Sequence, residues 1–139
     1  TKDAGSSQVF GAGFVTYANT AKQQVLHVSE DTLNSNGAVS EGVVRAMLLS
    51  ALTKAVADIG IAVSGVAGPG GGSEDKPVGT VWLAWGTKDK NEAIRLQIPG
   101  SRERFQILVA AIGLDLMRRQ LLELPPIPHY IKRFVYRSA

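Results

Sequence analysis

The 139-residue sequence contains no cysteine, and this absence removes several kinds of chemistry at once. Disulfides, thiolate metal sites and a cysteine nucleophile are excluded. The sequence also has only two histidines, and no set of histidine and acidic residues has the spacing of a metal site. We therefore expect no metal and no cofactor, and hydrolytic chemistry would need a base other than histidine.

Long hydrophobic runs are absent as well. No stretch reaches the roughly 18 uninterrupted apolar residues that cross a membrane, and no signal peptide is recognisable. The sequence is 45% hydrophobic and 19% charged, which is typical of a globular protein. These features predict a cytoplasmic protein without membrane contact, and the length is sufficient for one domain with a substantial core.

The order of the expected elements indicates an α/β protein. Runs rich in apolar and β-branched residues predict strands over 9–18, 59–65, 78–86 and 92–99. Helical spacing predicts helices over 19–26, 29–37, 40–57 and 102–124, with capping residues Asn19, Ser29, Ser40 and Ser101. The last two strands are expected to form an antiparallel hairpin. The pattern predicts an α/β sandwich with a mixed β-sheet.

A basic and aromatic tail follows this domain. We divide the chain into a domain over 1–124 and a tail over 125–139, in which basic residues alternate with aromatic ones: Tyr130, Lys132, Arg133, Phe134, Tyr136 and Arg137. Such a tail can bind nucleic acid or an anionic surface. A solvated end or an oligomer contact explains the charges better, and the aromatic rings favour a tail that packs on something.

The stretch "SGVAGPGGGSEDKPVG" over 64–79 lies between two predicted strands. Glycines let a backbone approach a ligand closely, and successive N–H groups can bind an anion. Neither the phosphate-binding loop motif nor the dinucleotide motif is present. Composition alone leaves a ligand-binding loop and a structural turn equally open. Ser64 ends the preceding strand, where its hydroxyl can face a ligand crevice.

Lys22 is a candidate general base. It follows Tyr17 by five residues in "YANTAK", at the expected junction of a strand and a helix. Burial or a nearby cation can lower the pKa of a lysine enough for this role. A surface lysine on a short helix remains the alternative, and the residues alone favour it.

Four segments together resemble a known family. "GAGFVTYANTAK", "GAVSEGVVRAM", "AVSGVAGPGGGSEDKPVGTVWLAW" and "PGSRERF" resemble, in order and spacing, the CinA C-terminal domain family over roughly residues 4–122. The resemblance implies a three-layer α/β/α sandwich, usually a homodimer. It also implies an amidase that hydrolyses the carboxamide of nicotinamide mononucleotide to give nicotinic acid mononucleotide and ammonia, in pyridine nucleotide recycling.

The resemblance assigns roles to individual residues. Lys22 matches the lysine that pairs with a nucleophilic serine, and Tyr17 and Asn19 match the tyrosine and asparagine of the same motif. The resemblance makes Tyr17 a second catalytic residue, which is expected to hold Lys22 or the serine hydroxyl in place. Arg102 matches an arginine that is a candidate phosphate or carboxylate contact. The remaining substrate contacts implied by the resemblance lie in and before the glycine stretch: Ser64, Gly65, Gly68, Gly70, Gly71 and Gly72.

The sequence departs from the family pattern in two ways. Ser101 replaces the usual aspartate before Arg102, and Gln106 stands where an arginine is frequent. The "ESCTGG"-like motif with the nucleophilic serine, its strand and its helix are absent. We therefore expect these residues to belong to a longer polypeptide. The alternative function is a non-catalytic nucleotide-binding protein, linked to competence or DNA damage.

Overall fold

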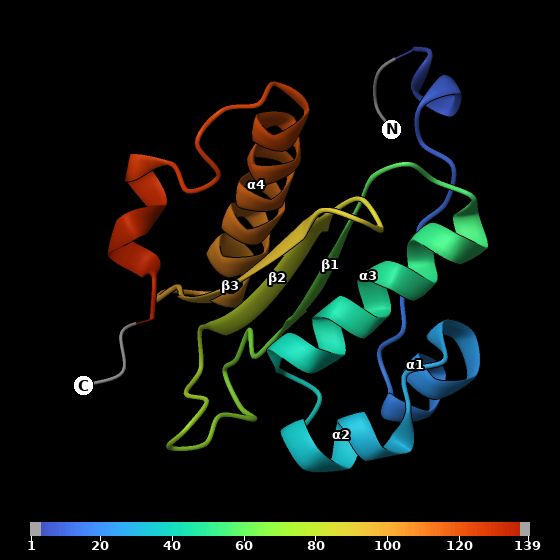
Figure 1. Cartoon of the computed structure of the whole chain (residues 1–139). Coiled ribbons are helices and arrows are strands. Elements are labelled where there is room, and N and C mark those ends of the chain that lie inside the picture. The colour runs from blue at the N-terminus through green and yellow to red at the C-terminus, as the bar shows by residue number, and fades with distance from the viewer. Residues whose placement is uncertain (1–3, 137–139) are drawn as a thin grey trace.

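A computed structural model of the chain describes residues 4–136. A three-stranded sheet lies between two helical layers (Figure 1). The helix α3 (Glu41–Ala55) covers one face, with α1 (Asn19–Leu26) and α2 (Glu30–Asn36) packed against it, and α4 (Arg102–Leu121) covers the other. Two short 3-10 helices complete the described elements, η1 (Ser6–Gln8) and η2 (His129–Phe134). The predicted α/β/α layering is confirmed.

The sheet has the order β1 (Gly60–Gly65), β2 (Thr80–Gly86) and β3 (Asn91–Gln97). Both pairings are antiparallel, with Val63 opposite Leu83 and Leu83 opposite Ile94. The predicted hairpin between the last two strands is confirmed. The strands of the described region thus form an antiparallel sheet, and the parallel pairing expected of a mixed sheet does not occur among them.

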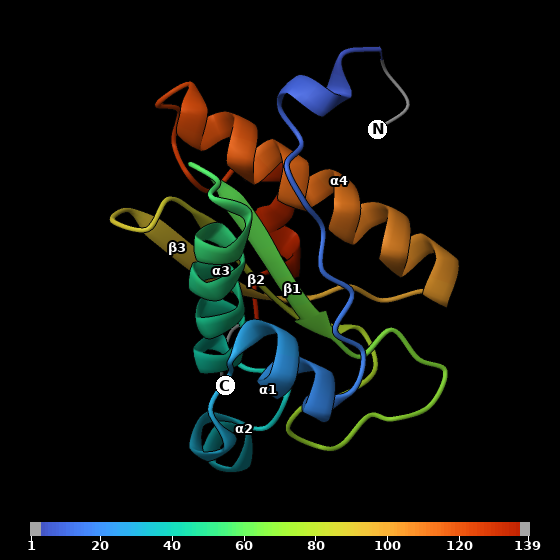
Figure 2. The ribbon, with the colours of Figure 1, turned by 90° about the vertical axis from the view of Figure 1, so that its right-hand side faces the viewer.

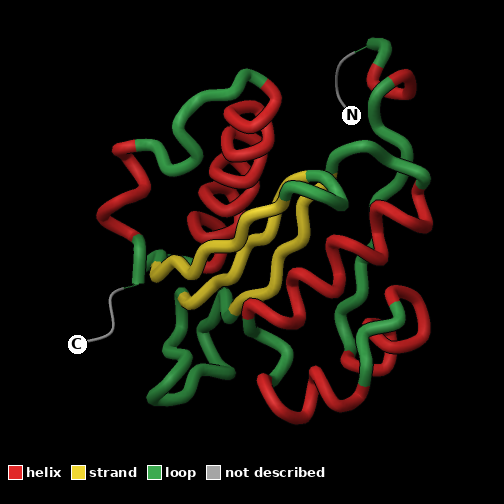
Figure 3. The backbone as a smooth tube through the Cα atoms, in the orientation of Figure 1, coloured by secondary structure: helices red, strands yellow, loops and turns green. Residues whose placement is uncertain are grey.

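The predicted strand over 9–18 is wrong. After η1 these residues run without regular structure along the open side of β1, as Figures 2 and 3 show. A strand needs a hydrogen-bonded neighbour, and this segment has none among the described residues. Most of its apolar side chains are exposed, Val9 to 89% and Val15 to 92%, while Phe14 is partly buried against the core. The residue types in this segment indicate a β-strand propensity, but they do not show whether a neighbouring strand is available for pairing.

Capping residues set the starts of three helices. Ser29, Ser40 and Ser101 each accept a hydrogen bond from the backbone N–H three residues later, as predicted. The predicted Asn19 cap is wrong. The helix α1 begins at Asn19 itself, and the capping position falls on Ala18, which has no side-chain oxygen.

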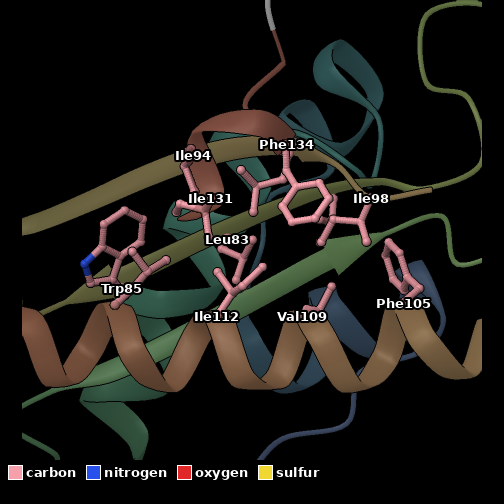
Figure 4. Packing of buried hydrophobic residues seen from close by; sticks show 12 residues of the cluster. Leu83, Trp85, Ile94, Ile98, Phe105, Val109, Ile112, Ile131 and Phe134 are labelled. Carbon is pink, nitrogen blue, oxygen red and sulfur yellow. The ribbon is translucent and has the colours of Figure 1, made fainter. Parts of the chain in front are cut away.

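The core between the sheet and α4 combines three segments (Figure 4). Alternate residues of β2 and β3 point toward α4, because side chains of a strand alternate between its faces. They meet one stripe of α4, formed by Phe105, Val109, Ile112 and Leu116. The helix packs tightly on β1 at Gly113, where an added Cβ would lie 2.2 Å from Cδ1 of Ile61. A side chain at position 113 would therefore force the end of the Ile61 side chain to move.

The tail packs on its own chain, as its aromatic residues indicated. Ile131 and Phe134 of η2 are buried in the core beside α4. Asp115 of α4 joins the two elements, because it accepts hydrogen bonds from Arg118, Arg119 and the hydroxyl of Tyr130. Arg137, which sequence analysis placed in the basic tail, lies outside the described residues.

We predict that Asp115→Asn destabilises the fold in a pH-dependent way. Partial burial raises the pKa of Asp115, but the hydrogen bonds from Arg118, Arg119 and Tyr130 outweigh it and lower this pKa from 3.8 to about 2. A carboxylate with a depressed folded-state pKa stabilises the protein above the unfolded value, and this contribution is lost as pH falls through the folded value. Urea unfolding at neutral pH should show a loss of roughly 1 to 3 kcal/mol.

The difference between the wild type and the variant should shrink as pH falls from 3.8 toward about 2. The exposed Asp58 gives a matched control, since Asp58→Asn should leave stability nearly unchanged. A gap that stays constant across this pH range would contradict the assignment of the stabilisation to the Asp115 carboxylate.

Candidate functional site

A groove of about 600 Å³ opens beside the free edge of β1. Its walls come from segments far apart in the sequence: residues 14–22, the residues before α3, the end of β1 and the first turns of α4. Figure 2 shows the N-terminal segment crossing this side of the molecule between α1 and α4. The volume is in the range of small-molecule sites.

Lys22 is the most unusual residue of the groove. Its side chain is only 6% exposed, and its Nζ donates to the backbone carbonyls of Thr16 at 3.0 Å and Tyr17 at 3.2 Å. No ion pair with Lys22 occurs in the described region. Burial lowers the pKa of Lys22 from its ordinary value of 10.5. The two carbonyls can accept both N–H bonds of a neutral amine, whose lone pair is then available as a base.

The segment before α1 supplies the lysine's acceptors. Tyr17 was expected to hold Lys22 or the serine hydroxyl in place. Its contact with Lys22 comes from the main-chain carbonyl, and its side chain is 83% exposed. Thr16 was missed by sequence reasoning. It is 8% exposed, lines the groove, and its hydroxyl has no hydrogen-bond partner among the described residues. Burying a hydroxyl without a hydrogen-bond partner costs free energy, and this hydroxyl belongs to a residue that lines the groove. We therefore add Thr16 to the candidate site.

Asn19, Ser64 and Gly65 also line the groove. The Ser64 hydroxyl donates to the carbonyl of Ala38 at 2.8 Å, which joins the end of β1 to the segment before α3. This bond occupies the Ser64 proton within the fold. The geometry thus makes Ser64 part of the wall, with an oxygen that can still accept a bond.

Arg102 lies at the start of α4 and faces the same groove. Its Nη1 donates to the carbonyl of Gly68 at 3.0 Å and so holds the first arm of the glycine stretch. Gly70, Gly71 and Gly72 are not among the residues that line the groove. The structure therefore brings together Tyr17, Asn19, Lys22, Ser64, Gly65 and Arg102, with Gly68 attached through Arg102.

The charge of the groove is positive. Arg102 is a permanently charged lining residue, Lys22 is the other basic one, and none of the lining residues is acidic. The N-terminus of α4 also points positive partial charge toward this end of the groove. Apolar contact comes from rings of Phe14 and Phe105. The arrangement suits an anionic ligand with an apolar or aromatic part.

Neither a membrane span nor a metal site was found in residues 4–136. No helix there is both long and apolar enough to cross a bilayer. The same residues contain no group of three or more histidine, cysteine, aspartate or glutamate side chains that could hold a metal ion.

Comparison with known sequences gives a consistent result. The CinA C-terminal domain model matches residues 1–121. A CinA-like protein of Colwellia psychrerythraea is 53% identical over 131 residues, which are 94% of this chain but 30% of that protein. The nicotinamide-nucleotide amidohydrolase PncC of Enterobacter agglomerans is 47% identical over 124 residues, 88% of this chain and 76% of that enzyme. The chain thus spans only part of these relatives.

Solved structures agree with the sequence relatives. A competence/damage inducible protein from Agrobacterium tumefaciens superposes with a TM-score of 0.81 at 37% identity, over 84% of this chain and 72% of that one. A competence damage-inducible protein from Klebsiella pneumoniae gives a TM-score of 0.74 at 40% identity, over 78% and 67% of the two chains.

We predict that the Lys22 ammonium loses its proton below the ordinary value of 10.5, because burial disfavours the charged form. The carbon-13 signal of its Cε, followed by NMR over a pH titration, measures this directly. The signal is assigned as the one that disappears in Lys22→Arg. A midpoint at or above 10.5 would contradict the structure's burial of this amine.

Proposed function

The chain belongs to the CinA C-terminal domain family, and from that membership we propose that it acts as a nicotinamide-nucleotide amidohydrolase. The reaction converts the carboxamide of nicotinamide mononucleotide to a carboxylate and releases ammonia. In this proposal the protein works as a cytoplasmic homodimer in pyridine nucleotide recycling. The observation that carries the proposal is the buried amine of Lys22 on the wall of a positively charged groove.

The proposed chemistry uses Lys22 as a proton carrier. A serine hydroxyl attacks the carboxamide carbon while Lys22 accepts its proton, and Lys22 then donates this proton to the departing amino group, which leaves as ammonia. Water next attacks the resulting ester, with Lys22 taking a proton and returning it to the serine. The nicotinic acid nucleotide is released. Each proton that Lys22 accepts is thus returned within the cycle.

The 139 residues contain no "ESCTGG"-like serine motif. Ser64 is a poor substitute, because its hydroxyl donates to Ala38 within the fold. The proposal therefore takes the attacking serine from polypeptide outside these residues. Lys22 would reach that serine from the groove wall, and backbone N–H groups near the nucleophile would stabilise the oxyanion by roughly 3 kcal/mol per donor.

Arg102 is the proposed contact for the nucleotide's phosphate. One of its five N–H groups is used on the Gly68 carbonyl, and its position at the start of α4 adds the helix's own positive end. Phe14 and Phe105 provide apolar surface for the pyridine ring in the same groove. The groove thus offers a separate partner to each end of the nucleotide.

We predict that Lys22→Ala abolishes ammonia release from nicotinamide mononucleotide by the complete gene product. Removal of a general base costs about 10² to 10⁴ in rate. The assay compares it with Lys54→Ala, which removes an exposed lysine of α3 and should retain full activity. Near-normal ammonia release by Lys22→Ala, with its fold intact by circular dichroism, would contradict the proposed base.

We also predict that Arg102→Gln weakens binding of nicotinamide mononucleotide about 10- to 100-fold, as expected for the loss of a charge-assisted hydrogen bond. Binding of nicotinamide riboside, which has no phosphate, should change little. Titration calorimetry with both ligands measures the difference. Arg104→Gln is the matched control, since Arg104 is exposed in the same helical turn but does not line the groove. An equal loss of affinity for both ligands would contradict a contact between Arg102 and the phosphate.

A non-catalytic nucleotide-binding protein is the second candidate function. The observation that favours it is the lack of the serine motif within the 139 residues, while Arg102 and the groove are present. Such a protein would bind nicotinamide mononucleotide in the calorimeter but release no ammonia. The same two assays therefore distinguish the candidates.

A further inference from the structure

The glycine loop, which we define as residues 66–79, has two arms in direct contact. An added Cβ at Gly68 would lie 2.5 Å from Cγ1 of Val78, and one at Gly72 would lie 2.8 Å from the Val78 backbone nitrogen. The arms therefore leave no room for a side chain at position 68 or 72, and Val78 packs directly on the Gly68 backbone. Gly68 follows Ala67, which lines the groove, and accepts the hydrogen bond from Arg102.

The strand β3 holds the second arm of this loop. Arg95 and Gln97 are two residues apart and so point to the same face of the sheet. The Arg95 guanidinium donates to the carbonyl of Asp75, and Nε2 of Gln97 donates to the carbonyl of Val78 at 2.8 Å. Because Val78 packs on Gly68, these two side chains set the position of the arm that borders the groove.

The end of the chain in turn holds Arg95. The guanidinium carbon of Arg95 lies 3.7 Å from the centre of the Tyr136 ring. The backbone N–H of Tyr136 donates to the Arg95 carbonyl at 3.1 Å, and Val135 forms an isolated antiparallel bridge with Leu96. The Arg95 Nε has no hydrogen-bond partner in the described region, so the ring is a major restraint on the guanidinium plane.

We propose that Val135 and Tyr136 form a positioning element for the candidate site. Tyr136 orients Arg95, Arg95 fixes Asp75, and the second arm of the glycine loop fixes Gly68 and the groove wall. Tyr136 and Arg95 are positioning residues, because neither lines the groove. Both residues of the element lie beyond the residues 1–121 that match the family. The consequence for ligand binding rests on the proposed function.

Hydrogen–deuterium exchange of the whole chain tests the structural part. The readout is exchange in peptides from the glycine loop, including the Ser73 amide, which donates to the Lys76 carbonyl. Tyr136→Leu removes the ring and should speed this exchange about 2- to 5-fold, as expected for loss of a cation–π contact. Tyr136→Phe keeps the ring and should match the wild type. Peptides from α4 should exchange equally in all three proteins.

The chain contains a matched control for this contact. The guanidinium of Arg133 lies 4.7 Å from the ring centre of Phe134 in the same tail, and within residues 4–136 Arg133 forms no hydrogen bond or ion pair with the glycine loop. Arg133→Gln therefore removes a cation–π contact and a tail charge, and loop exchange should stay unchanged. If Tyr136→Leu loosens α4 as well, Arg95→Gln provides the second test, since it removes the link from within the folded sheet.

Titration with nicotinamide mononucleotide tests the functional part. Tyr136→Leu and Arg95→Gln should raise the Kd, and in the assay the KM, about 2- to 5-fold while kcat stays unchanged, because they loosen the wall without touching Lys22. Unchanged loop exchange in both variants would overturn the proposal. Faster loop exchange with an unchanged Kd would overturn it too. If the wild type neither binds nor hydrolyses the nucleotide, the proposed function fails, and the exchange result alone decides whether Tyr136 orders the loop.

Discussion

The burial of β2 is the constraint on which the rest of the structure depends. Its neighbours β1 and β3 occupy both of its edges, while α3 and α4 cover its two faces. Val81, Leu83 and Trp85 face α4, and Ala84 faces α3, so one short strand contributes to both cores. The glycine loop enters this strand directly. The C-terminal end of the glycine loop is therefore fixed by a fully packed strand, and this restrains the groove wall to which the loop belongs.

The open edge of β1 gives the candidate site its shape. A sheet edge presents unpaired backbone groups, and in this molecule the irregular segment with Phe14 to Tyr17 passes along that side. The same segment turns its carbonyls toward Lys22, which draws the amine into a poorly solvated position. The pKa of Lys22 falls because burial removes water and no carboxylate compensates for it. The lowered pKa of Lys22, which suits it to act as a base, thus results from the fold around it.

Much of the fold could be predicted from the sequence because its signals are local. The caps at Ser29, Ser40 and Ser101 act over three residues, and the hairpin of β2 and β3 has its turn in the sequence itself. The strand predicted over 9–18 is wrong, because a strand needs a neighbouring strand to pair with, and residue propensity does not reveal one. For the site, the family resemblance selected Lys22 over the surface lysine that residue type favoured. The contact of Arg95 with Asp75 could not be predicted, since it joins segments separated in the chain, and the unpaired Thr16 hydroxyl follows from burial in the folded protein.

The basic side chains of the groove and of the glycine loop share one kind of hydrogen-bond partner, and this affects the charge that remains at the groove. Lys22, Lys76, Arg95 and Arg102 all donate to backbone carbonyls, on Thr16 and Tyr17, Asn36, Asp75 and Gly68 respectively. A carbonyl orients a cation without cancelling its charge, whereas a carboxylate would neutralise it. Lys76, Arg95 and Arg102 hold the glycine loop, while Lys22 lies in the groove, where it acts as a base only in its neutral form. The contact that ties Arg102 to the loop therefore leaves its full positive charge at the groove, which favours entry of an anionic ligand.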